Sequence, residues 1–224
     1  MMDIIEYGDS ALLINFEQKI DLEINKLVNA YFKSINKLDY ILYQIPAYCS
    51  LTVRYDKSKT SYHALKSKIE DIEIDQLNLN ENSNLIEIPV CYDLSFGVDL
   101  ESLSNELGLS INELVKLHTS QEYYVFMMGF LPGFPYLGKL PEKLKCKRKD
   151  TPRKRVDKGS VAIAGSQTGI YPINAPGGWQ IIGRTPIEIF DASKEEGILL
   201  NMGDKVKFKS IGQEEYKELV QHGS

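Results

Sequence analysis

Residues 159–186 have the sequence GSVAIAGSQTGIYPINAPGGWQIIGRTP, and this stretch decides the fold of the second half of the chain. Short runs of β-favouring residues at 161–164 and 180–182 are separated by glycine and proline, which end strands and form tight turns. Similar runs follow at 187–190, 198–200 and 206–211. Many short strands interrupted in this way are typical of a closed β-barrel. The sequence therefore predicts a barrel in this region.

The first part of the chain alternates strand and helix signals. A strand pattern at 11–16 precedes a helical pattern over 27–38, for which Asp21 is a candidate cap. Two further strands at 40–45 and 50–55 form a hairpin, and a second helix is expected over 58–72. Strand, helix, two strands and helix is a split βαβ arrangement. It predicts a small ferredoxin-like α/β domain over residues 1–84.

The polar segment 78–84 has the composition of a connector, so we place the domain boundary near residue 84. A strand at 85–92 either completes the first sheet or begins the second domain, residues 85–224. Helices are expected at 100–107 and 111–117, the second opening with Ser110 and Glu113 in capping-box spacing, and at 212–221. The predicted fold class is α+β.

Composition excludes several kinds of protein. The 224 residues are 43% hydrophobic, which suffices for a sizeable core, and a net charge of -5 argues against a protein that coats nucleic acid or anionic membrane. The three cysteines lack CxxC spacing, so neither a disulfide framework nor a metal site is expected. The acidic N-terminus is unlike a signal peptide, and the apolar charge-free stretch 123–137 is shorter than a membrane span and is interrupted by glycine and proline. We expect a cytoplasmic protein. Residues 103–115 mimic a helix-turn-helix, but their acidic neighbours oppose DNA binding.

Residues 129–138, GFLPGFPYLG, combine aromatic side chains with residues that restrict the backbone. Such a loop is either a turn packed into the core or a rigid apolar surface that another chain buries. The second interpretation predicts a partner interface at Phe130, Pro132, Gly133 and Tyr136.

A basic segment follows at 142–158, with nine lysines and arginines against three acids. Runs of lysine are usually solvated, but arginine is the better planar clamp for carboxylate or phosphate. Arg153, beside Pro152, is the candidate here, and Arg184 in the segment 183–186 is a second. The turn 174–179 places Trp179, the only tryptophan, where it can line a pocket.

His118 lies on the apolar face of its predicted helix, in step with Ile111, Leu114 and Val115. It is either a structural histidine with satisfied hydrogen bonds or a general base acting near neutral pH. Two familiar catalytic motifs are missing: Ala164 stands where a nucleophile elbow around Ser166 needs glycine, and no GxxxxGK[ST] nucleotide loop occurs.

Several motifs occur in one order along the chain: 7–13 (YGDSALL), 88–92 (IPVCY), 108–110 (GLS) with His118, 129–138, 159–165, 167–172 (QTGIYP), 176–179 (PGGW) and 183–186 (GRTP). Together they resemble the PxpB (KipI) family, the B subunits of bacterial 5-oxoprolinase, also described as allophanate hydrolase subunit-one-like. The resemblance covers nearly the whole chain. It implies an α/β N-terminal domain followed by a cyclophilin-like β-barrel.

The resemblance also implies a function. The chain is expected to be a non-autonomous subunit of a complex that opens 5-oxoproline to L-glutamate with ATP, alongside PxpC (KipA)-type and PxpA-type partners. A lactam is a poor electrophile, and a route through a phosphorylated oxygen needs cations and hydrogen-bond donors. Residue type then assigns the cationic role to Arg153 and Arg184, amide hydrogen bonds to Gln167 and Gln180, and exclusion of water to Phe134 and Trp179.

Two alternatives remain. Some proteins that this chain resembles are described as inhibitors of a sensor histidine kinase, for which binding without chemistry would suffice. Related domains also form part of biotin-dependent urea carboxylase, so an allophanate hydrolase or urea carboxylase-like amide enzyme is the other alternative.

Overall fold

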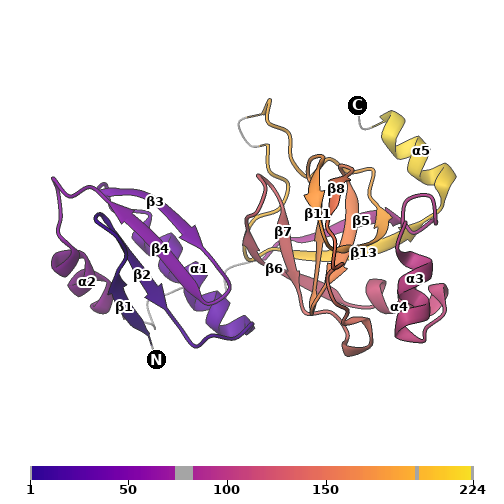
Figure 1. The fold of residues 1–224 in the computed structure, drawn as a ribbon. Coiled ribbons are helices and arrows are strands. Elements are labelled where there is room, and N and C mark those ends of the chain that lie inside the picture. The colour runs from indigo at the N-terminus through magenta and orange to yellow at the C-terminus, as the bar shows by residue number, and fades with distance from the viewer. Residues whose placement is uncertain (1, 74–82, 195–196, 223–224) are drawn as a thin grey trace. The chain divides into compact units, whose positions relative to one another are not determined.

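The computed structural model describes residues 2–73, 83–194 and 197–222, drawn in Figure 1. The chain forms two compact units, Met1–Ser83 and Asn84–Ser224. Both combine helices with strands, so the predicted α+β class is confirmed. The connector expected at 78–84 lies for the most part outside the described residues.

The first unit is a four-stranded antiparallel sheet in the order β1-β2-β4-β3, accompanied by two helices. Alternate residues of β2 and β4 are buried, as expected for a sheet with one covered face. The elements in chain order are β1 (Asp3–Glu6), β2 (Ala11–Asn15), α1 (Leu22–Ile35), β3 (Ile41–Pro46), β4 (Ser50–Tyr55) and α2 (Tyr62–Glu70).

Short-range polar contacts fix both helices of this unit. The Asp21 carboxylate accepts hydrogen bonds from two backbone N–H groups at the start of α1, so the expected cap is confirmed. The buried Asn25 amide donates to the carbonyls of Ala47 and Tyr48, which holds the β3–β4 turn on α1. The second helix begins at Tyr62, not at residue 58, because the preceding residues form a turn closed by an aspartate side chain.

Strand β1 was not predicted, and it changes how the first sheet is completed. It forms a hairpin with β2 and occupies the outer position beside it. The strand expected at 85–92 is β5 (Leu85–Cys91), and it belongs to the second unit. The N-terminus therefore supplies the edge strand that a split βαβ chain would take from the segment after its second helix.

The second unit is a closed barrel of seven strands in the order β10-β7-β6-β13-β5-β12-β9. Neighbouring strands are antiparallel except β5 and β13, which are parallel over seven residue pairs. The predicted barrel is thus confirmed. Its strands after β5 are β6 (Glu122–Met128), β7 (Pro135–Gly138), β9 (Ser160–Ala164), β10 (Gln167–Ile170), β12 (Gln180–Arg184) and β13 (Lys205–Ile211).

Further elements surround the barrel (Figure 1). The capping box of Ser110 and Glu113 is present and starts the second of its helices. These elements are α3 (Leu100–Leu107), α4 (Ile111–Thr119), α5 (Gln213–His222), the short 3-10 helix η2 (Glu142–Leu144) and a separate two-stranded sheet of β8 (Arg153–Val156) and β11 (Ala175–Gly177).

Two of the expected strands were wrong. Segments 187–190 and 198–200 share only a single bridge, between Phe190 and Ile198, because their apolar side chains fill the core from irregular backbone. Strand β8 was missed for the opposite reason. Its sequence RKRV looks like a solvated charge run, although Val156 is buried.

Strand β9 separates two apolar clusters and thereby positions the site. All five of its residues are buried. Val161 and Ile163 belong to the main barrel core, whereas Ala162 and Ala164 belong to a second cluster with Phe134, Tyr171 and Trp179. Because successive strand residues point to opposite faces, the aromatic cluster packs on the face of β9 that lies opposite the barrel core.

Candidate functional site

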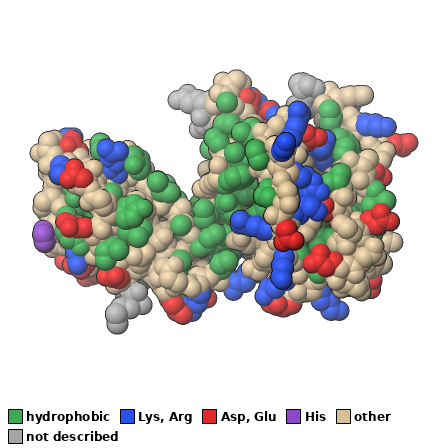
Figure 2. Space-filling view, in the orientation of Figure 1, with side chains coloured by type: hydrophobic (Ala, Val, Ile, Leu, Met, Phe, Trp, Pro, Cys, Tyr) green, Lys and Arg blue, Asp and Glu red, His purple; other side chains and the backbone are tan. Residues whose placement is uncertain are grey.

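A pocket of about 260 Å³ opens over the aromatic cluster. Its walls come from segments far apart in the sequence, namely 130–136, Tyr171 and Trp179, and its rim from Arg148, Lys149 and Pro152 together with the turn 176–178. In Figure 2, lysine and arginine side chains gather over β8 and β11, beside an apolar area over β6 and β7. The pocket thus combines apolar walls with a cationic rim.

Phe134 is the centre of the aromatic wall and is only 1% exposed. Its ring meets Tyr136, Tyr171 and Trp179 edge-to-face, with centroids 5.0, 5.3 and 5.6 Å away. Contacts of this kind contribute roughly 0.5–1.5 kcal/mol each beyond burial. The walls are therefore rigid before any ligand arrives.

The turn that carries Trp179 is fixed by close backbone contacts. A Cβ on Gly177 would lie 2.1 Å from the Tyr171 hydroxyl, so only glycine fits there. The Gly178 carbonyl accepts a 2.7 Å hydrogen bond from the Lys149 N–H. These contacts join the turn to both the aromatic wall and the basic segment.

Two cations of the basic segment are neutralised by one buried carboxylate. Asp99, 2% exposed, accepts hydrogen bonds from Lys149 Nζ at 2.8 Å and from the Arg153 guanidinium at 2.5 Å. Burial raises the pKa of Asp99, but hydrogen bonds from Arg153, Lys149 and the Ile181 N–H outweigh that effect and hold the pKa below its usual value. Asp99 is therefore ionised at neutral pH.

Arg148, in contrast, keeps its charge available. Its guanidinium lies 5.9 Å from the centroid of the Trp179 ring, at the pocket rim. Within the part of the chain that the structure describes, it has neither an ion pair nor a hydrogen bond. Its field reaches the pocket wall, since it opposes the rise that burial causes in the pKa of Tyr136 and of Tyr171. Arg148 is the group at this rim best able to bind an anion.

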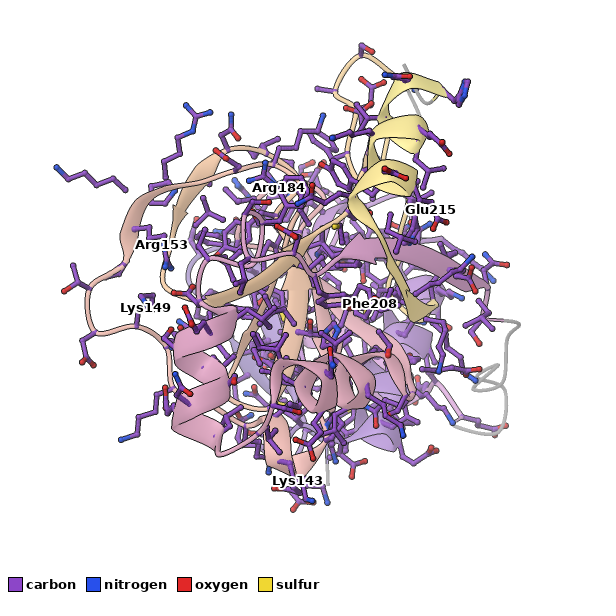
Figure 3. All side chains as sticks on the ribbon, turned by 90° about the vertical axis from the view of Figure 1, so that its right-hand side faces the viewer. Lys143, Lys149, Arg153, Arg184, Phe208 and Glu215 are labelled. Carbon is purple, nitrogen blue, oxygen red and sulfur yellow. The ribbon has the colours of Figure 1, made fainter. Side chains whose placement is uncertain are left out.

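The two arginines singled out from the sequence lie elsewhere. Arg153 is bound to Asp99, and Arg184 pairs with Asp157 at 2.9 Å and covers the Phe96 ring. Figure 3 shows Arg153 beside Lys149, with Arg184 apart from them and nearer α5. Neither arginine lines the pocket. Their catalytic role stays a prediction that this geometry does not favour.

The other predicted ligand contacts divide in the same way. Phe134 and Trp179 come together in the pocket. Gln180 is buried beside it, and its amide donates to the Lys147 carbonyl, so it supports the basic segment from behind. Gln167 lies on β10 between β7 and β9, and it does not line the pocket.

The predicted partner-interface residues are only partly accessible. Phe130 is 61% exposed at the pocket mouth and has a φ of 66°, a strained conformation for an aromatic residue. Pro132 is also exposed. Gly133 is buried against Phe190, and the half-buried Tyr136 faces the pocket. An interface here would therefore be formed by Phe130 and Pro132.

His118 is enclosed in the barrel core. Thr168 donates its hydroxyl to the Ala162 carbonyl, so it accepts from the His118 Nε2–H at 2.9 Å. The Tyr92 hydroxyl then donates to Nδ1 at 2.8 Å, and Phe208 stacks on the ring. Burial lowers the pKa of His118 to about 3. These contacts are those of the structural histidine, and a general base would have to break both hydrogen bonds.

His118 should make stability depend on pH. Its pKa is near 6.5 in the unfolded chain and about 3 in the folded one, so the unfolded state gains a proton first as pH falls. Stability from this group is complete above pH 6.5 and is lost below it, by about 1.4 kcal/mol per pH unit. Urea unfolding between pH 4 and 7 should show this slope in the wild type and lose it in His118→Gln.

His63, which is exposed, provides the control. The variant His63→Gln should keep the wild-type slope, because this exposed side chain lies outside the barrel core. An unchanged slope in His118→Gln would show that this histidine binds equal numbers of protons in the folded and unfolded chain, which would contradict its lowered pKa.

Among the described residues there is no group of three or more His, Cys, Asp or Glu side chains that could hold a metal ion. In the same ranges no helix is both long and apolar enough to cross a membrane.

Comparison with known proteins identifies the family. The family model of the carboxyltransferase domain, subdomain C and D, matches residues 2–200. A 5-oxoprolinase B subunit from Bacillus subtilis is 40% identical, covering 94% of this chain and 93% of that protein. The chain belongs to the family of 5-oxoprolinase B subunits. The 5-oxoprolinase B subunit of Escherichia coli O157:H7 is 37% identical over 90% of this chain and 92% of its own length.

More distant relatives carry this domain within longer chains. The crystal structure of the protein TTHA0988 matches with a TM-score of 0.81 and 33% identity, covering 90% of this chain but only 40% of that one. A urea amidolyase of Saccharomyces cerevisiae is 25% identical over 97% of this chain and 13% of its own length. The family resemblance of the sequence is thus confirmed, with the amide enzymes as distant relatives.

Three residues of the site escaped the sequence analysis: Asp99, Arg148 and Tyr171. Arg148 belongs to a charge run from which Arg153, beside Pro152, was chosen, and Tyr171 lies between the apolar residues Ile170 and Pro172. Asp99 is 50 residues away from Lys149. The sequence around Asp99 contains no feature that indicates an ion pair with a residue so far along the chain.

Proposed function

We propose that this chain is the B subunit of an ATP-dependent 5-oxoprolinase and that its pocket holds the lactam acid during ring opening. The proposal rests on its family and on one structural observation, the rigid aromatic pocket with the unpaired Arg148 at its rim. The chain is non-autonomous in this account. PxpC (KipA)-type and PxpA-type subunits complete the complex in the cytoplasm.

The pocket suits a small ring that bears a carboxylate. Its volume of about 260 Å³ lies below the range of roughly 300–1,000 Å³ that drug-sized ligands occupy. The flat lactam would lie against Trp179 and Phe134, whose rings keep water away. Arg148 would bind the carboxylate through two parallel hydrogen bonds. Lys149, already paired with Asp99, would contribute less.

ATP does not fit this pocket, and the sequence has no phosphate-binding glycine loop. We therefore assign ATP and the phosphoryl step to the partner subunits. The exposed Phe130 and Pro132 at the pocket mouth are the surface that a partner would cover. Closure there would remove the ligand from water.

The two units also support a finer assignment of fold. The sheet order of the first unit fits a ferredoxin-like variant whose edge strand comes from the N-terminus. The seven-stranded barrel fits the cyclophilin-like fold that the family resemblance implies. Prolyl isomerase activity does not follow, because one fold hosts many functions.

Trp179 allows a direct test, since it is the only tryptophan and lies in the pocket. Titrating the purified chain with 5-oxoproline should change its fluorescence in a saturable way. The matched control is 2-pyrrolidinone, the same lactam without the carboxylate, which should bind at least tenfold more weakly. Equal affinities for both compounds would show that Arg148 does not bind the carboxylate. No response to either would favour the kinase-inhibitor alternative.

A further inference from the structure

We propose that Asp99 is a positioning residue that sets the anion selectivity of the pocket. By neutralising Lys149 and Arg153, it leaves Arg148 to bind a single carboxylate. The inference rests on the proposed function for the identity of the ligand. The ion pairs of Lys149 and Arg153 with Asp99, and the position of Arg148 over Trp179, are observed without any ligand.

The backbone around Asp99 lies directly on strand β12. A Cβ on Gly97 would be 2.5 Å from the Ile182 carbonyl, so the two chains touch there. The Asp99 N–H donates to the Ile181 carbonyl at 3.0 Å, and the Ile181 N–H donates to Asp99 Oδ2 at 2.8 Å. Two backbone contacts thus hold the main chain here on β12, and one hydrogen bond fixes the carboxylate, independently of the basic segment.

Asp99 stands at a helix start but does not cap the helix. It occupies the N-cap position of α3, where an aspartate usually accepts a hydrogen bond from the first turn. Its side chain makes no such bond. One oxygen is used by β12, and the other receives both Lys149 and Arg153. The carboxylate therefore binds Lys149 and Arg153 of the basic segment and does not cap α3.

This arrangement determines which cation a ligand meets. Lys149 lines the pocket, but its ammonium group is held by Asp99, and Arg153 is held on the same oxygen. A carboxylate entering the pocket thus finds Arg148 as the cation without an ionic partner in the described part of the chain. Without Asp99, Lys149 would become a second binding cation, and the pocket would favour dianions.

The variant Asp99→Asn tests this inference. Asparagine keeps the size and can still accept from the Ile181 N–H, but it loses the charge. With Trp179 fluorescence as the readout, the preference for 5-oxoproline over glutarate, a dicarboxylate, should fall at least tenfold. Asp157→Asn is the control, because it also removes a carboxylate that pairs with arginines, outside the pocket lining. Its selectivity should equal that of the wild type.

A double variant separates selectivity from structure. Asp99→Asn combined with Lys149→Met removes the freed cation and should restore the wild-type preference, provided that far-ultraviolet circular dichroism shows a folded chain. If Asp99→Asn keeps wild-type selectivity, or if the double variant stays altered, the inference is overturned. Should Asp99→Asn alone fail to fold, selectivity in the double variant still decides. Sulfate and acetate, titrated in parallel, report the same dianion-to-monoanion ratio if 5-oxoproline does not bind. The anion titration therefore tests the role of Asp99 even if the proposed function, binding of 5-oxoproline, is wrong.

Discussion

Replacing Arg148 by glutamine is expected to weaken the binding of 5-oxoproline roughly tenfold to a hundredfold while the chain stays folded. Hydrogen bonds to a charged group contribute about 1.5–3 kcal/mol, and Arg148 is the cation without an ionic partner among the described residues at the rim. Stability should change little, because the side chain is exposed and pairs with no acid in the described structure. Calorimetric titration measures the affinity without relying on fluorescence.

Arg155→Gln is the matched control for this prediction. Arg155 comes from the same basic segment, is 69% exposed and pairs with Asp157 outside the pocket. Its replacement should leave the affinity unchanged, since an exposed ion pair contributes little. Equal losses in both variants would mean that the whole basic segment attracts the ligand by its charge, with no specific site at Arg148.

The second large effect is expected from Gly177→Ala. The added Cβ would overlap the Tyr171 hydroxyl, 2.1 Å away, so either the ring or the turn 176–179 must move. Overpacking of this kind typically costs about 1–3 kcal/mol. Because Tyr171 and Trp179 are both pocket walls, ligand binding should be lost together with part of the stability. Urea unfolding and ligand titration measure the two effects separately.

Gly178→Ala provides a close comparison at the next position. A Cβ there meets its nearest neighbour at 3.6 Å, an ordinary contact, so stability should stay within about 0.5 kcal/mol of the wild type. Equal stabilities of the two alanine variants would show that Tyr171 can move to accommodate the added methyl group at residue 177, which would contradict the rigid pocket.

The barrel could be predicted because its strands carry local signals. The runs in β9, β12 and β13 are β-favouring and are bounded by glycine, proline or asparagine, so sequence alone located them. Strand β1 was missed because it is short and lies close to the end of the chain. The segments 187–190 and 198–200 have strand composition, but only their bridge at Phe190 and Ile198 was formed. Packing of their apolar side chains in the core, and not their intrinsic β-propensity, determined the conformation of these two segments.

Residue type predicted the aromatic walls of the site but not which arginine lies at its rim. Phe134 and Trp179 stand in motifs of glycine and proline, which suggested a built loop, and the structure brings them together. The choice among arginines could not be made from the sequence. Arg153 and Arg148 occur in one charge run, and what distinguishes them is a buried carboxylate at the start of α3 that binds one and not the other. His118 shows the same limit, since its hydrogen-bond partners, Tyr92 and Thr168, are 26 and 50 residues away in the sequence.

The central claim is that this chain is an incomplete part of a 5-oxoprolinase. The most direct measurement is 5-oxoproline-dependent ATP hydrolysis by the purified chain, by its candidate partner subunits and by the mixture. We expect turnover only in the mixture, lowered at least tenfold when the chain carries Arg148→Gln. Turnover by the chain alone, or full turnover by the partners without it, would contradict the account.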